Sequence, residues 1–124
     1  MTRYYDTLLE EQRGPFTVIV DKTWEDLNPR DLFDDCLDVE EIIKDIDRGH
    51  LEWFMLRTRV IFEGVELAAE YLGGCLYEEP KECLTDGMAE DQIYQALQNA
   101  RKEFALLREK INKIDEKMVD EVCA

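Results

Sequence analysis

The amino-acid sequence predicts an α+β fold, and three observations lead to this prediction. Short runs of alternating apolar residues predict a small antiparallel sheet of about three strands, at residues 15–20, 51–62 and 65–77. Two segments with apolar residues at every third or fourth position predict helices at residues 29–48 and 88–121. The 124-residue chain has no linker rich in proline, glycine or serine and no internal repeat, so we expect a single domain, residues 1–124.

Turn and capping residues delimit the first predicted strand and the helix that follows it. The segment PFTVIV is rich in β-branched residues and lies between Gly14 and Asp21, which is typical of a strand. Asn28 is a favourable N-cap, Pro29 suits the first helical position, and Gly49 favours the left-handed conformation that ends a helix. The apolar stripe expected to face the core is Leu32, Cys36, Val39, Ile43 and Ile46.

Residues 51–77 are predicted to form a β-hairpin. The first strand has an apolar face, made of Phe54, Leu56, Val60 and Phe62. Arg57 and Arg59 lie on its other face. Glu63–Gly64 predicts the tight turn, and Gly73–Gly74 predicts a bulge or turn in the second strand. The segment ELAAEYL is by itself also compatible with a helix.

The C-terminal helix carries the most regular pattern. From Ile93 onward, apolar residues alternate at steps of four and three for about four heptads, which is typical of a coiled-coil seam. A helix of about thirty residues is roughly 45 Å long, whereas such a domain has a radius of gyration of about 14 Å. Part of the helix should therefore extend beyond its own domain and favour a homodimer. The residues expected to mediate this contact are Leu97, Phe104, Leu107, Ile111, Ile114 and Met118.

The composition restricts the classes of partner. Fifteen basic and 30 acidic residues give a net charge of −15 at pH 7, which argues against direct binding to nucleic acid or to an anionic membrane and favours a basic protein surface. No segment has the apolar length of a membrane span or of a signal peptide. The four cysteines form no CxxC pair, so we expect reduced thiols, no zinc site and a cytoplasmic protein.

Motifs for catalysis or for cofactor binding are weak. The segment DIDRG resembles the start of a calcium loop, but His50 and Leu56 stand where that loop needs glycine and glutamate. His50 is the single histidine, so a Ser/His/Asp or Cys/His system would depend on it alone. We therefore expect no enzyme activity, no catalytic residue, no metal and no cofactor.

The segment NPRDLFDDCLDVEEIIKDIDRG is unusually acidic. It carries eight carboxylates from Asp31 to Asp47, which on one helix amounts to a negative charge per roughly 3 Å of axis, close to the ~3.4 Å per phosphate of a DNA strand. Like charges at helical spacing do not stabilise a helix, so this pattern indicates either a solvated face or a binding face. The candidate partner-binding residues are Asp31, Asp34, Asp35, Asp38, Glu41 and Asp45.

A short, strongly acidic, single-domain α+β chain with the stripe DLFDDCLDVEEIIKDID resembles the small phage or mobile-element proteins that inhibit host defence, including DNA-mimic anti-restriction and anti-CRISPR proteins. The resemblance lies in size and charge pattern. It implies a non-enzymatic inhibitor in the host cytoplasm, whose Asp and Glu side chains occupy a basic nucleic-acid-binding surface of a host defence protein or complex.

Two other functional classes remain open. One is a homo-oligomeric assembly or interaction protein that acts through its C-terminal helix, with the acidic residues serving solubility. The other is a small enzyme with a carboxylate site, which would show a deep pocket lined by acids with perturbed pKa values.

Overall fold

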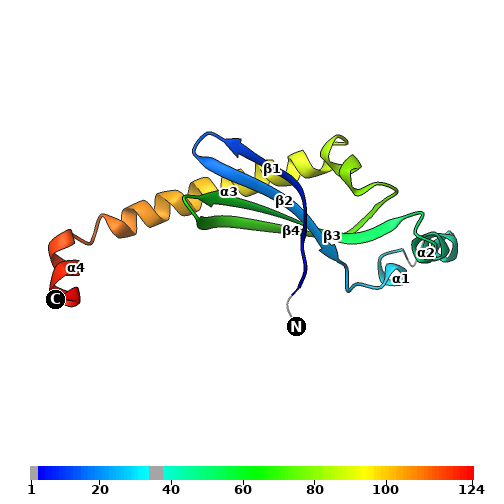
Figure 1. The fold of residues 1–124 in the computed structure, drawn as a ribbon, viewed down its shortest axis with the longest axis horizontal. Helices are drawn as coiled ribbons and strands as arrows, with labels where there is room; N and C mark the ends of the chain where they lie inside the picture. The colour runs from blue at the N-terminus through cyan, green and yellow to red at the C-terminus, as the bar shows by residue number, and fades with distance from the viewer. Residues whose placement is uncertain (1–2, 34–37) are drawn as a thin grey trace.

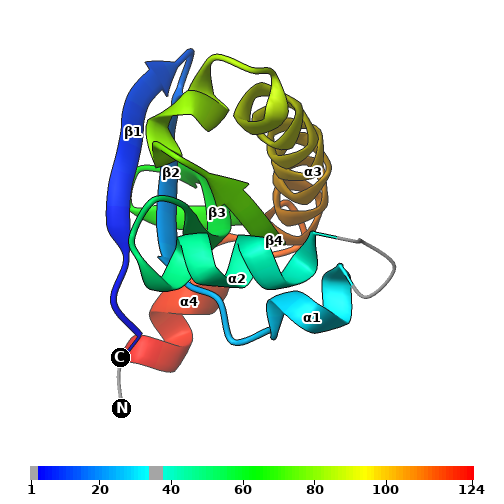
Figure 2. The same cartoon turned by 90° about the vertical axis from the view of Figure 1, so that its right-hand side faces the viewer.

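The computed structural model describes residues 3–33 and 38–124. These residues form a four-stranded antiparallel sheet with a long helix packed along it (Figures 1 and 2), so the predicted α+β class is confirmed. The strands follow one another in the order β1-β2-β3-β4. The elements are β1 (Asp6–Arg13), β2 (Phe16–Trp24), α1 (Pro29–Leu32), α2 (Val39–Asp47), β3 (Glu52–Phe62), β4 (Val65–Tyr77), the 3-10 helix η1 (Pro80–Leu84), α3 (Met88–Ile111) and α4 (Glu116–Cys123).

β1 is an addition to the three predicted strands. Its sequence, DTLLEEQR, is mostly polar, and a charged strand suits the edge of a sheet because it discourages pairing with other chains. The signal for it lies in the turn, since Arg13 pairs with Phe16 and leaves a two-residue loop, Gly14–Pro15. Gly14 has a φ of 60°, which is the conformation that a glycine at this turn position adopts without strain.

The predicted hairpin is confirmed as β3 and β4, which pair antiparallel from Phe62 and Val65 back along both strands. Glu63 and Gly64 both have positive φ, 47° and 80°, as a tight turn of this kind requires. The pairing shifts between Leu56, which faces Leu72, and Phe54, which faces Cys75. Gly73–Gly74 therefore forms the predicted bulge.

The core lies between the sheet and α3, which packs against β3 and β4. Small residues of α3 let its backbone approach the strands closely. The buried side chains from the helix are Ala89, Ile93, Ala96 and Ala100, and those from the strands are Val18, Val20, Phe54, Leu56, Val60, Leu67 and Cys75. The predicted apolar face of β3 is confirmed, although Phe62 at its end is only partly buried.

The predicted helix at residues 29–48 is corrected to two short helices. α1 ends at Leu32, because Phe33, its C-cap, has a φ of −114° and a ψ of 27° that are not helical. α2 begins after its N-cap Asp38, which has a φ of −101° and a ψ of 13°. The caps are as predicted, because the Asn28 side chain accepts a hydrogen bond from the Arg30 amide. Past the end of α1, the Phe33 ring packs on Trp53, with ring centroids 5.8 Å apart. Cys36, Asp34 and Asp35 lie outside the described residues.

The predicted helix at residues 88–121 is likewise corrected to two helices. α3 ends at Ile111, and Asp115 adopts an extended conformation from which its carboxylate accepts a hydrogen bond from the Met118 amide at 2.9 Å. This aspartate therefore starts a new helix rather than continuing the seam, as its strong N-cap preference favours. The end of α3 nevertheless extends past the sheet, with α4 beyond it, as Figure 1 shows.

Candidate functional site

No buried catalytic or metal site stands out in the described part of the chain. Within residues 3–33 and 38–124, no three His, Cys, Asp or Glu side chains are grouped so that they could hold a metal ion. No helix in these same ranges combines the length and apolar character needed to cross a membrane. His50 is exposed, and its Nδ1 lies 3.7 Å from the Asp45 carboxylate, with which it forms an ion pair only when the imidazole is protonated. The candidate sites are therefore surfaces.

The first surface is an apolar groove where α3 leaves the sheet. It has a volume of about 450 Å³ and lies between the tip of the β3–β4 hairpin and the last turns of α3. We call it the arm groove. Its apolar lining is Phe62, Val65, Leu67, Phe104, Leu107 and Ile111, with Arg108 and Asn112 also lining it. Val65 and Ile111 are 54% and 64% exposed, so this part of the lining faces solvent, whereas Leu67 is buried.

The second surface is one side of α4. Its apolar residues follow helical spacing and line a shared hollow. We call it the α4 patch, made of Ile114, Met118, Val119, Val122 and Cys123. All residues from 111 to 124 are exposed, and Val122 reaches 86%. Within the described residues, α4 packs extensively against no other element.

The six predicted oligomerisation residues divide into three groups. Leu97 and Leu107 are partly buried and pack against the chain's own core, so Leu97 is not part of either exposed surface. Leu107 also lines the arm groove, together with Phe104 and Ile111, and the remaining two residues lie on the α4 patch. The seam is therefore not continuous, because its first half covers the sheet and its second half is broken at the link between α3 and α4.

The groove residues from the hairpin, Phe62, Val65 and Leu67, were not among the predicted contacts. The helical repeat cannot indicate them, because they belong to the hairpin and come close to α3 only in the folded structure. Val119 and Val122 were also missed, since the new helix that starts at Asp115 has its own phase. Asp115 itself was the available sequence signal.

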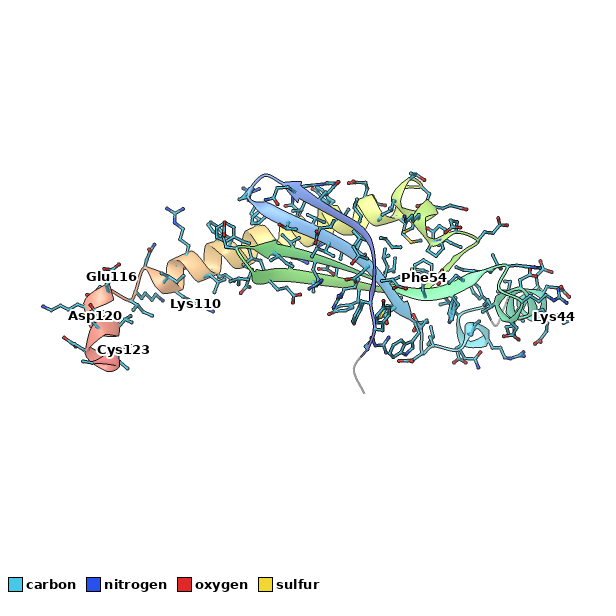
Figure 3. The ribbon with its side chains drawn as sticks, in the orientation of Figure 1. Lys44, Phe54, Lys110, Glu116, Asp120 and Cys123 are labelled. Carbon is cyan, nitrogen blue, oxygen red and sulfur yellow. The ribbon has the colours of Figure 1, made fainter. Side chains whose placement is uncertain are left out.

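The two segments that carry these surfaces have net charges of opposite sign. Residues 101–113, at the end of α3, carry five basic and two acidic side chains, a net of +3. Residues 115–124 carry four acidic side chains and one basic, a net of −3. Figure 3 shows Lys110 near the end of α3 and both Glu116 and Asp120 on α4. The end of α3 is thus a basic segment in a protein of net charge −15.

The predicted acidic residues that the structure describes lie at the other end of the molecule, around α1 and α2 (Figure 1). The acidic head is our name for its four described members, Asp31, Asp38, Glu41 and Asp45. Asp31 belongs to α1, Asp38 precedes α2, and Glu41 and Asp45 lie on α2. They do not share one helical stripe, so the phosphate-like spacing expected for a single helix does not apply.

Nearby cations partly neutralise the acidic head. Glu41 lies 3.5 Å from the Lys44 ammonium, and Asp45 lies 3.8 Å from the Arg48 guanidinium. Arg30 donates to Glu40, which connects α1 to α2 and holds the pKa of that carboxyl below its usual value. Exposed pairs of this kind contribute little to stability, but they reduce the charge available to a partner.

A buried ionic cluster links β2 to β3 on the face that carries the arginines. The Arg57 guanidinium donates to both carboxylate oxygens of Asp21, at 2.8 and 2.6 Å, and Arg59 lies 3.6 Å from the same carboxylate. Asp21 is only 1% exposed. The hydrogen bond to Asp21 raises the pKa of Arg57. Tyr5 covers the Arg57 guanidinium, 3.4 Å from the ring centroid, which is typical of a cation–π contact.

This cluster explains why β2 runs beyond the predicted residue 20. Asp21 was interpreted as the end of the strand, but Arg57 faces it directly across the pair of strands. The buried carboxylate is therefore neutralised, and the strand continues to Trp24. Asp21 is paired on both sides by arginines, which fits a structural role.

No family model, no curated protein and no solved structure matches this chain significantly, so the geometry of its own surfaces carries the functional argument.

Proposed function

We propose that the protein is a non-enzymatic, self-associating binding protein that assembles through its C-terminal arm, defined as α3 from Phe104 onward together with α4. The observation that carries the proposal is the exposed apolar surface of this arm. The arm starts on the sheet, where Phe104 packs on Phe62 of the same chain, and then leaves the body of the domain (Figure 1). Its residues 111–124 are all exposed.

Two physical arguments support association. Burying a Val, Ile, Met or Phe side chain completely is worth about 1.5–3 kcal/mol, and the arm exposes about half or more of several such side chains. α4 is eight residues long, whereas an isolated helix needs roughly 12–15 residues to be stable in water. Packing of its apolar side on another chain would supply the missing stabilisation.

The proposal is tested by one substitution with a matched control. Ile111→Asp places a charge in the arm groove at a side chain that is 64% exposed, so it should leave the fold intact. Leu106→Asp makes the same change on the same helix at a side chain that is 50% exposed and does not line the groove. Leu107 is unsuitable, because it packs against the core.

Sedimentation velocity at tens of micromolar, on the affinity scale of weak dimers, should show wild type and Leu106→Asp as dimers and Ile111→Asp as a monomer. Circular dichroism should be the same for all three proteins. A monomeric wild type, or an equal response of both variants, would contradict assembly through the arm.

The acidic head supports a second candidate function, which we propose as the runner-up. In it, the protein acts as a DNA-mimic inhibitor that binds a basic nucleic-acid-binding surface of a host defence protein. The supporting observation is that Asp31 and Asp38 are exposed and that, among the described residues, neither has a cation within 4 Å. The head lies at the opposite end from α4, so assembly and inhibition are compatible (Figure 1).

Charge reversal tests the second candidate. Asp38→Lys with Glu41→Lys should abolish inhibition of DNA binding by a CRISPR effector complex or a restriction enzyme, and inhibition by wild type should weaken between about 50 and about 200 mM salt. Glu66→Lys with Glu78→Lys is the control, since both residues are exposed, lie outside the head and change the net charge equally. Equal loss of inhibition in both double variants would indicate a general charge effect.

A further inference from the structure

We propose that the occupant of the arm groove is α4 of a second copy of this chain, with the two copies exchanging their α4 helices reciprocally. This inference rests on the proposed self-association and specifies how it occurs. The groove and the α4 patch are different surfaces of one chain, so each copy can insert its α4 into the groove of the other and receive the other's α4 in return. A two-fold arrangement then closes at two copies and leaves neither surface exposed.

The chemistry of the two surfaces is complementary. The α4 patch presents aliphatic side chains and a methionine from one side of a helix, and the groove is lined by aromatic and aliphatic side chains. A helix that lays its apolar side into such a groove is a common mode of recognition between proteins.

Charge favours the same pairing. The helix that borders the groove carries a net of +3 over residues 101–113, with Arg108 among the groove residues, whereas residues 115–124 carry a net of −3. Between two copies of a protein with net charge −15, most surfaces repel each other. Packing the end of α3 against α4 instead brings together two segments of opposite net charge.

The position of α4 favours a second chain over its own groove. The groove lies back along α3 toward the hairpin, whereas the link through residues 112–115 leads α4 away from the sheet (Figures 1 and 3). The Asp115 carboxylate caps the start of α4 by accepting from the Met118 amide. An extended arm with an unfilled groove beside it is the geometry of an exchanged dimer.

Disulfide crosslinking between two differently tagged full-length chains tests the exchange. One chain keeps the native Cys123 on α4, and the other carries Val65→Cys in the groove and Cys123→Ser. Both chains carry Cys36→Ser, while Cys75 and Cys83 are buried and stay unreactive. Mild oxidation should give a covalent heterodimer in high yield.

The control replaces Val65→Cys with Gln95→Cys, at an exposed position on the first half of α3 outside the groove. It should crosslink at least about tenfold less. If the chains form dimers in sedimentation but the two cysteine positions crosslink equally, the exchange is wrong and association through the arm stands. A monomeric protein would overturn both. A chain with Cys123 and Val65→Cys that crosslinks only within itself would place α4 in its own groove and overturn the exchange.

Discussion

At the residue scale, the Asp21 cluster shows what a single sequence conceals. The alternation of β3 predicts that Arg57 and Arg59 lie opposite the apolar face, and this is observed. Their partner depends on which residue of β2 lies across from them, and only the register of the sheet determines it. Asp21 is consequently a polar residue that is buried because it is paired.

Removing the carboxylate should be costly. Asp21→Ala leaves two largely buried guanidiniums without a counter-charge, so we expect the free energy of unfolding to fall by about 3 kcal/mol. Urea denaturation should show this as a lower midpoint. Glu66→Ala, at an exposed position, should change stability by no more than about 0.5 kcal/mol. Similar effects in both variants would mean that the cluster contributes little.

The buried thiols predict a pH dependence at alkaline pH. Burial, together with the neighbouring Cys83, raises the pKa of Cys75 from 9.0 to about 11. The folded protein therefore holds this proton more tightly than the unfolded chain does. Its contribution to stability is complete below pH 9 and is lost as the pH rises toward 11. Denaturation between pH 8 and about 11 should show this decline, and Cys75→Ala should make it shallower; an unchanged slope would contradict the assignment.

At the scale of elements, turn and capping residues correctly predicted the turns, the bulge and the helix ends. The Glu63–Gly64 turn, the Gly73–Gly74 bulge and the caps at Asn28 and Gly49 are all found where glycine and asparagine indicated them. The errors concern continuity. The apolar periodicity continues past Asp115, but the helix does not, because Asp115 caps the start of a new helix. The spacing of apolar residues alone does not reveal where such a cap interrupts a helix. The edge strand β1 lacks an apolar face, so periodicity could not detect it.

Gly74 connects two elements, and its substitution should reveal this connection. It has a φ of 69°, and a Cβ atom there would lie 2.5 Å from Leu32 of α1 and 3.3 Å from Trp53. Gly74→Ala should cost about 1–2 kcal/mol in backbone strain and roughly 1 kcal/mol more from displacing Leu32. Gly14→Ala, with φ of 60° and nothing within 4 Å, should cost the strain alone.

Urea denaturation of both glycine variants gives the difference. The indole signal of Trp53 should shift in an NMR spectrum of Gly74→Ala only, since its Nε1 donates to the Leu27 carbonyl beside α1. Equal losses of stability, with unchanged indole signals, would show that Leu32 moves aside freely.

At the scale of the whole molecule, the long axis separates two surfaces, with the acidic head at one end and α4 at the other (Figure 1). The sequence predicted the overhang, because the length of its heptad pattern exceeds the size of a domain. It predicted only part of the candidate site, since three of the six apolar residues that line the arm groove, Phe62, Val65 and Leu67, come from the hairpin. The pattern also predicts a single acidic helix, whereas the acidic head is divided between two short helices.

Deletion of residues 114–124 tests this division of the molecule. The core cluster includes no residue beyond Leu107, so the truncated protein should fold with unchanged circular dichroism apart from the lost turns of α4. An associating protein gains stability with concentration, whereas a monomer does not. The urea midpoint of the full chain should therefore rise as the protein concentration is raised from about 1 to about 100 micromolar. The midpoint of the truncated protein should stay constant and equal that of the full chain at the lowest concentration. If the truncated protein is unfolded, α4 is needed for the domain to fold. If its unfolding midpoint still rises with concentration, the chains associate through another surface.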